Sequence, residues 1–111
     1  MIELPNNTSS LDDAPLYVGG AVTPDEISAL WKAEFDTIYA EGGMFMLTCH
    51  PRAGFGSGIP SRARVIDRLI GYIRTFPDVH FTRLDELASW CLNADNGFMA
   101  SPKTGWIGGR A

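Results

Sequence analysis

Apolar residues recur at helical spacing in three stretches of the chain, and a polar capping residue precedes each stretch. The clearest stretch predicts a helix over residues 24–41, because Thr23 and Glu26 form a capping-box pattern and Pro24 suits the first helical position. Gly42 then supplies the backbone freedom that a helix C-cap needs. The apolar stripe of this helix consists of Ile27, Leu30, Trp31, Phe35, Ile38 and Tyr39.

Two further helices are expected later in the chain. Ser61 is the predicted cap of the second, which runs roughly from Arg62 to Phe76, and Thr82 is the predicted cap of the third, with Asp85 at its third position. The stripe of the second helix consists of Val65, Ile66, Leu69, Ile70, Ile73 and Phe76. The buried side of the third consists of Leu84, Leu87, Ala88 and Cys91.

Three short apolar runs predict strands, at residues 2–4, 44–49 and 79–81. The run 44–49 is apolar on both faces, which is typical of a parallel strand covered by helices. Strands that alternate with helices indicate right-handed βαβ units. The sequence therefore predicts an α/β fold of about three parallel strands alternating with three helices. This is only a portion of a (β/α) barrel, since a complete one needs roughly 200 residues or more.

The remaining segments are expected to be irregular. Residues 12–15 indicate a turn, and residues 16–18 a loop that packs against the core. Residues 93–111 are rich in Gly, Ser and Asn and predict a loosely packed tail. We therefore expect one partial α/β domain over residues 1–92, followed by this tail.

Length, composition and charge argue against several classes of function. A length of 111 residues allows one small domain, and the net charge of −4 argues against non-specific binding to nucleic acid. The chain has no apolar run long enough to cross a membrane, and residues 1–10 do not resemble a signal peptide. Two cysteines are too few for a disulfide framework, which favours a reducing, cytoplasmic compartment.

Charge is unevenly distributed along the chain. Residues 1–41 carry eight acidic side chains and one basic one, whereas residues 52–74 carry five arginines and one acidic side chain. Neighbouring helices with complementary faces explain this better than an anion-binding surface, because exposed helix charges are usually only solvated. The glycine-rich loop 54–58 leads into a helix with Arg62 and Arg64, but no Walker sequence follows. A mobile loop is favoured over a phosphate site.

The candidate chemistry lies where the predicted strands end. His50 follows the run 44–49, and Asp12 and Asp13 follow the first strand, so all three are expected at the carboxyl edge of one sheet. If the strands are neighbours, about 5 Å apart, a carboxylate can meet the imidazole and orient it as a general acid. The alternatives are a capping histidine and turn-forming aspartates. His80, within the third strand, is expected to pack, and Cys49 and Cys91 lack zinc-site spacing.

Several segments together resemble the C-terminal part of the NodB-like polysaccharide deacetylases, in the branch of peptidoglycan deacetylase-like and allantoinase-like proteins. Residues 41–51 match a helix end, an E-G-G turn and a strand that leads into an L-T-x-H-P ending. Residues 60–62 match a P-S-R helix start, and residues 79–90, which read VHFTRLDELASW, resemble a V-x-F-x-T-x-x-E-x-A-x-W ending. Residues 11–17 match a D-D-x-P segment, so the resemblance covers about residues 1–92 in order and spacing.

The resemblance implies a distorted (β/α) barrel that hydrolyses amide or other C–N bonds with a divalent metal, usually zinc. It implies that His50 is the general acid that protonates the leaving nitrogen, and that Asp12 or Asp13 tunes it. The family's T-F-D-D and H-x-x-x-H segments, which hold the base and the metal ligands, are absent from this sequence. We therefore expect no metal ligands and no cofactor in this chain, with zinc only in the full-length family protein, and an inactive isolated chain.

Three origins of such a chain follow. The sequence is most simply a C-terminal piece of a longer gene product, because Met1 falls at a predicted strand where the family chain continues. It can also be a small subunit that completes a separately encoded N-terminal half, or a non-catalytic oligomer joined through open sheet edges. In the complete protein the substrate is expected to be an amide-bearing sugar or a small cyclic amide.

Overall fold

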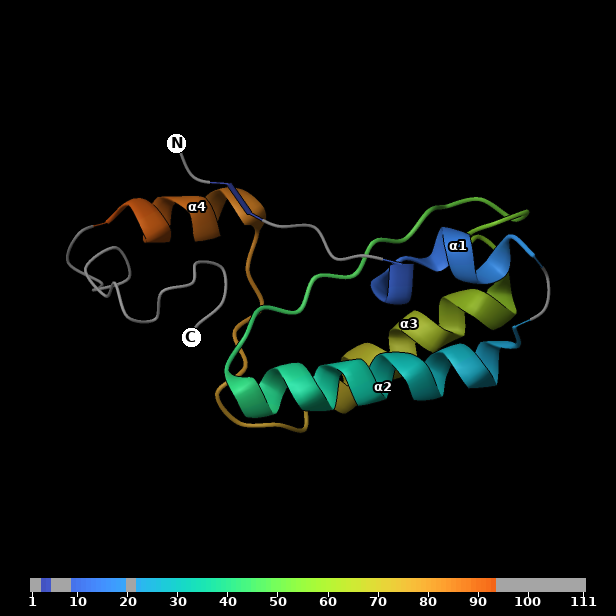
Figure 1. Ribbon diagram of the computed structural model, residues 1–111, viewed down its shortest axis with the longest axis horizontal. Coiled ribbons are helices and arrows are strands. Elements are labelled where there is room, and N and C mark those ends of the chain that lie inside the picture. Colours follow the sequence, from blue (N-terminus) through green and yellow to red (C-terminus); the bar gives the residue numbers. More distant parts are fainter. Residues whose placement is uncertain (1–2, 5–8, 20–21, 94–111) are drawn as a thin grey trace.

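The structure is a computed structural model that describes residues 3–4, 9–19 and 22–93. Its elements are a 3-10 helix η1 (Ser9–Leu11) and four α-helices: α1 (Asp13–Tyr17), α2 (Pro24–Glu41), α3 (Pro60–Ile73) and α4 (Leu84–Leu92). Helices α2 and α3 lie side by side, with α1 near one end of the pair and α4 at the opposite end of the molecule (Figure 1). An extended segment leaves α2 and runs back past α1 before α3 begins (Figure 1).

The helix predicted over residues 24–41 is confirmed, including both of its ends. The Glu26 amide donates to Thr23 Oγ1 at 3.2 Å, and the Thr23 amide donates to Glu26 Oε1 at 2.9 Å, which completes the capping box. Pro24 occupies the first turn, and Gly42 adopts a left-handed conformation at φ 71°. Local sequence signals are sufficient here because each terminal group is satisfied within a few residues.

The other two predicted helices exist, but their starts differ from the prediction. Ser61 is not the cap of α3, because Ile59 holds that position without a side-chain hydrogen bond and Pro60 begins the helix. Helix α3 ends at Ile73 instead of Phe76. In α4 the cap is Arg83, whose amide donates to Glu86 Oε1 at 3.2 Å. The glutamate therefore performs the role that the prediction gave to Asp85.

The core lies between α2, α3 and the segment around α1. Trp31 is completely buried, and its Nε1–H donates to the carbonyl of Ser10 at 2.9 Å, which ties η1 to α2. Burial of each large apolar side chain contributes about 1.5–3 kcal/mol, so this cluster is the main stabilising feature of the described chain. The buried apolar residues of the cluster are Leu11, Tyr17, Ile27, Trp31, Phe35, Val65, Leu69 and Ile73.

The predicted α/β fold, a (β/α) barrel portion with three parallel strands, is wrong. Among the described residues the only strand-like pairing is one isolated parallel bridge between Asp12 and Thr48, and no sheet forms. A strand needs hydrogen-bonding neighbours, and the segment 44–48 meets one short stretch that immediately turns into α1. The extended backbone of residues 44–47 therefore remains outside any sheet.

Other irregular segments also differ from prediction. Residues 79–81 are not a strand, Phe81 is 56% exposed, and His80 is exposed instead of packed. Residues 13–17, predicted as a turn and a loop, form the short helix α1, because the Asp12 side chain caps it. Residues 3–4, the described part of the first predicted strand, are not in a strand, and residue 2 and nearly all of the predicted tail (94–111) lie outside the described residues.

In the part of the chain that the structure describes, none of the helices has both the length and the apolar character needed to cross a bilayer.

Candidate functional site

The single parallel bridge brings the predicted site residues together. The Asp13 amide donates to the Thr48 carbonyl at 3.1 Å, and the Thr48 amide donates to the Leu11 carbonyl at 3.0 Å. Asp12 caps α1 by accepting from the Ala14 amide at 3.0 Å. Two hydrogen bonds thus fix the start of α1 beside the segment that carries His50, although no sheet forms.

The Asp13 carboxylate is the centre of the site. It is fully buried, and its Oδ1 lies 2.7 Å from His50 Nδ1. Its Oδ2 accepts from the His50 amide at 2.9 Å and from the Ser57 hydroxyl at 2.7 Å. A buried carboxylate needs such partners, because an unpaired charge without water is costly.

The two aspartates, which the sequence did not distinguish, have different positions. Asp13 makes the direct contact with the imidazole, whereas the nearest Asp12 oxygen lies 3.8 Å from His50 Nδ1 and caps α1. Asp13 is therefore the partner that orients the ring. Asp12 adds negative charge at the rim, where its side chain is 26% exposed.

Hydrogen bonding keeps Asp13 ionised. Burial by itself raises the pKa of this carboxyl, but the hydrogen bonds from the His50 ring and amide and from Ser57 outweigh it, and the charge of His50 acts in the same direction. The net pKa lies below the ordinary value of 3.8. An ionised carboxylate only accepts hydrogen bonds, so His50 Nδ1 must carry a proton.

The glycine-rich loop closes over this pair. The Ser57 amide donates to the His50 carbonyl at 2.9 Å, and the Gly56 and Gly58 amides donate to the Arg52 carbonyl at 3.0 and 3.2 Å. A Cβ at Gly56 would collide with the carbonyl and side chain of His50, and one at Gly58 would collide with the backbone of Arg52. Ser57 was missed by sequence reasoning, although the Gly-Ser-Gly pattern just after His50 signals this close approach.

Arg62 holds the loop to the helices. Its guanidinium donates to the carbonyls of Ala53 and Gly56 at 2.8 and 3.1 Å, and it lies 4.1 Å from the centre of the Tyr17 ring. Arg62 was considered from the sequence as a ligand for an anion, but in the structure its guanidinium binds the backbone of the loop. These contacts attach the loop to the helices, whereas the sequence predicted a mobile loop.

The His50 side chain is only partly enclosed. His50 has a side-chain exposure of 36%, and Nε2 lies on the side of the ring opposite to the nitrogen held by Asp13. The Phe55 ring meets His50 edge to face at 5.5 Å, and the Arg52 guanidinium lies 5.9 Å from the Phe55 ring. The surroundings of the ring therefore include one aromatic side chain and, packed against it, one cation.

The geometry does not support a mechanism in which Ser57 or Cys49 acts as a nucleophile. The Ser57 hydroxyl donates to Asp13 and not to His50, and Ser57 is only 7% exposed, so the histidine cannot activate it. Burial of the thiol and the negative charge of Asp13 raise the pKa of Cys49 to about 11, which leaves little thiolate at neutral pH. Proton transfer through His50 is the chemistry that the arrangement supports.

The same residues do not fit a zinc ion. Asp12, Asp13 and His50 could each offer one atom within 4.8 Å of the others. However, both Asp13 oxygens and His50 Nδ1 already hydrogen-bond within the site, and one Asp12 oxygen caps α1. A metal ion at this point would break the contact that orients the imidazole, and zinc needs three or four available ligands.

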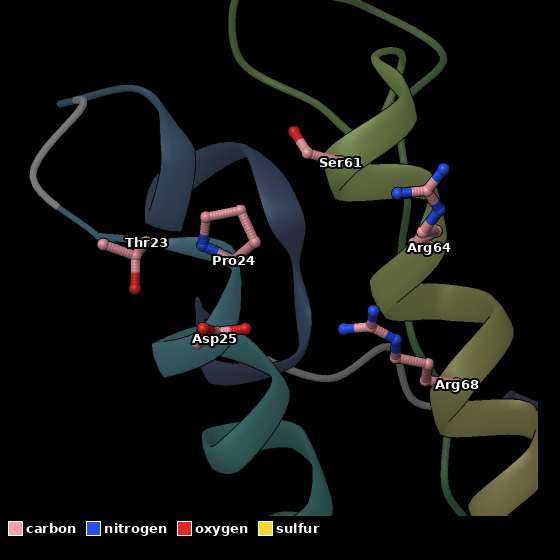
Figure 2. Close-up of a pocket in the computed structure, with 6 residues that line it drawn as sticks. All are labelled: Thr23, Pro24, Asp25, Ser61, Arg64 and Arg68. Atoms are coloured by element: carbon pink, nitrogen blue, oxygen red, sulfur yellow. The ribbon is translucent and has the colours of Figure 1, made fainter.

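A second polar cleft lies between the starts of α2 and α3. It has a volume of about 240 Å³ and is lined by Thr23, Pro24, Asp25, Ser61, Arg64 and Arg68. Figure 2 shows Arg68 of α3 extending towards Asp25 of α2. Among the described residues no ion pair joins α2 to α3, so the predicted charge complementarity is not realised as salt bridges. The exposed arginines of the cleft lie in solvent.

Comparison with protein families, with curated proteins and with solved structures gives no match to this chain. The resemblance to the NodB-like deacetylases therefore stays a prediction from the sequence motifs.

Proposed function

We propose that this chain supplies the general-acid half of a hydrolase site that acts on C–N bonds of the amide type, as in polysaccharide deacetylase-like enzymes. The observation that carries the proposal is the 2.7 Å contact between His50 Nδ1 and the buried Asp13 carboxylate, made by a histidine side chain that is itself 36% exposed. A histidine held in this way has one nitrogen fixed and one free to transfer a proton.

The proton path follows from this geometry. The doubly protonated ring of His50 donates the proton on Nε2 to the leaving nitrogen as the C–N bond breaks. The proton on Nδ1 stays on the ring and remains hydrogen-bonded to Asp13. The neutral imidazole that results therefore keeps its orientation after the transfer. Phe55 packs against the His50 ring and Arg52 against Phe55, and we expect an amide-bearing sugar or a small cyclic amide to bind beside these side chains.

The other half of the site comes from a partner polypeptide or from a further segment of a longer protein. The lack of fit to zinc supports this, because a deacetylase-like reaction requires a metal half that the described residues do not form. Large apolar side chains at and near α4 support it as well. Those exposed by half or more are Phe81, Leu84, Trp90 and Leu92. An open groove of about 500 Å³ lies beside them, lined by Leu4, Met46, Leu47, Thr48, Cys49 and Leu84.

The test is reconstitution. The chain is co-expressed with the polypeptide encoded directly upstream, provided that it carries T-F-D-D and H-x-x-x-H segments, and acetate release from N-acetylated oligosaccharides is measured. We expect activity with the native chain and a loss of roughly 10²–10⁴-fold with His50→Gln, the usual contribution of a general acid. His80→Gln is the matched control, because His80 is exposed and makes none of the site's hydrogen bonds. Equal rates for H50Q and the native complex would contradict the proposal.

A second candidate function is that of a non-catalytic subunit or oligomeric interaction domain. The exposed apolar side chains around α4 favour it, because such groups are usually covered. The same experiment separates the candidates: a stable complex whose activity is insensitive to H50Q indicates an interaction role.

The proposed compartment is the cytoplasm. Both cysteines, Cys49 and Cys91, are free thiols, which is the common state in a reducing compartment.

A further inference from the structure

We infer that Ser57 is a positioning residue for His50, acting through Asp13. The effect of Ser57 on catalysis rests on the proposed function, whereas its effect on the position of His50 follows from contacts within this chain. The Ser57 hydroxyl donates to Asp13 Oδ2 at 2.7 Å, while Asp13 Oδ1 meets His50 Nδ1 at 2.7 Å. Each carboxylate oxygen therefore has its own side-chain partner, which prevents the carboxylate from rotating away from the imidazole.

The backbone beside Ser57 strengthens this effect. The Ser57 amide donates to the carbonyl of His50, so the serine contacts both the histidine backbone and the carboxylate that holds the histidine ring. Gly56 and Gly58 allow this close approach, because neither position has room for a Cβ. The hydroxyl reaches Asp13 only because the loop lies directly on the His50 segment.

Arg62 determines where the loop lies. Its hydrogen bonds to the carbonyls of Ala53 and Gly56 and its contact with the Tyr17 ring connect the loop to α3 and α1. The orientation of His50 thus depends on a chain of contacts from two helices through Ser57 to the buried carboxylate. At the end of this series of contacts, Ser57 donates a side-chain hydrogen bond to Asp13, on the carboxylate oxygen that the His50 ring does not contact.

The test is NMR spectroscopy of the full 111-residue chain. In the native chain the His50 Nδ1–H proton should give a resolved downfield signal that exchanges slowly with water. In Ser57→Ala we expect exchange at least ~10-fold faster, because Asp13 loses a donor that the hydrogen-bonded carboxylate requires. In Ser57→Thr, which keeps the hydroxyl, we expect the native signal. Unchanged exchange in Ser57→Ala would overturn the inference.

A matched control separates positioning from a general loss of stability. Ile73→Val trims a buried core residue away from the loop and should leave the His50 signal unchanged. Faster exchange in Ile73→Val at the same loss of stability would also overturn the inference. If Ser57→Ala does not fold, Ser57→Cys takes its place, since a thiol is a weak donor and should give faster exchange, and native exchange would overturn the inference. None of these readouts depends on a reconstituted enzyme, so a failure of the proposed function is recognised separately.

Discussion

Asp13 is the residue on which the candidate site depends, because it is charged, fully buried and bonded to three donors from two residues. A hydrogen bond to a charged group contributes about 1.5–3 kcal/mol, and the removal of a buried acceptor leaves its donors unsatisfied. The sequence could place an aspartate near His50, but it could not choose between Asp12 and Asp13. That choice depends on the cap of α1, which orients Asp12 towards the Ala14 amide and leaves Asp13 facing the histidine.

The lowered pKa of Asp13 makes the stability of the chain depend on pH in a defined direction. The ionised form stabilises the folded state fully above the ordinary value of 3.8, and this contribution is lost as the pH falls through the lower native pKa. We expect the free energy of unfolding in urea to decrease from about pH 5 to pH 3 in the native chain, and to decrease less in Asp13→Asn. Parallel curves for the two proteins would contradict this prediction. Asp67→Asn is the control, since Asp67 is exposed on α3 and takes part in none of the hydrogen bonds of the site.

At the scale of elements, the glycine-rich loop is a closely packed part of the site, and its glycines differ in their roles. Gly56 lies against the His50 carbonyl without room for a Cβ, whereas Gly54 has open space around it. We expect Gly56→Ala to destabilise the chain by about 1–3 kcal/mol, as overpacking does. Gly54→Ala should be neutral or stabilising by up to ~1 kcal/mol. Urea unfolding of both variants measures the difference, and equal stabilities would show that the loop does not pack closely.

The elements also mark where prediction from the sequence succeeds. The ends of α2 were predictable because Thr23, Glu26 and Gly42 satisfy the helix termini locally. The predicted strands could not be checked from the sequence, because the run 44–49 becomes a strand only if other strands pair with it, and an apolar run does not reveal its neighbours. The Gly-Ser-Gly pattern indicates that the backbone of this loop lies close to another segment, but it does not reveal that Ser57 contacts Asp13, which is distant in sequence. Helices are determined locally, whereas sheets and sites depend on contacts between distant segments.

At the scale of the whole molecule, the described chain combines a helical core with the His50–Asp13 pair, the acid half of the proposed site. The core of α2 and α3 supports α1 and the loop, and these hold Asp13 and His50 in contact. The exposed apolar groups near α4 and the groove next to Cys49 lie on the part of the molecule that this core does not cover. If His50 is the general acid as proposed, this uncovered apolar surface is where we expect a partner with the remaining chemistry to bind.

Zinc binding by the isolated chain tests this division directly. Because His50 Nδ1 and both Asp13 oxygens already form hydrogen bonds, a zinc ion would have to break the contact that keeps Asp13 paired in its buried position. We therefore expect elemental analysis after dialysis against zinc to find far less than one equivalent per chain. We also expect titration calorimetry to detect no tight site, for the native chain and for His50→Gln alike. About one equivalent of zinc that disappears in H50Q would mean that these residues release their hydrogen bonds for a metal. The acid half and the metal half would then lie in the same chain, and the need for a partner would disappear.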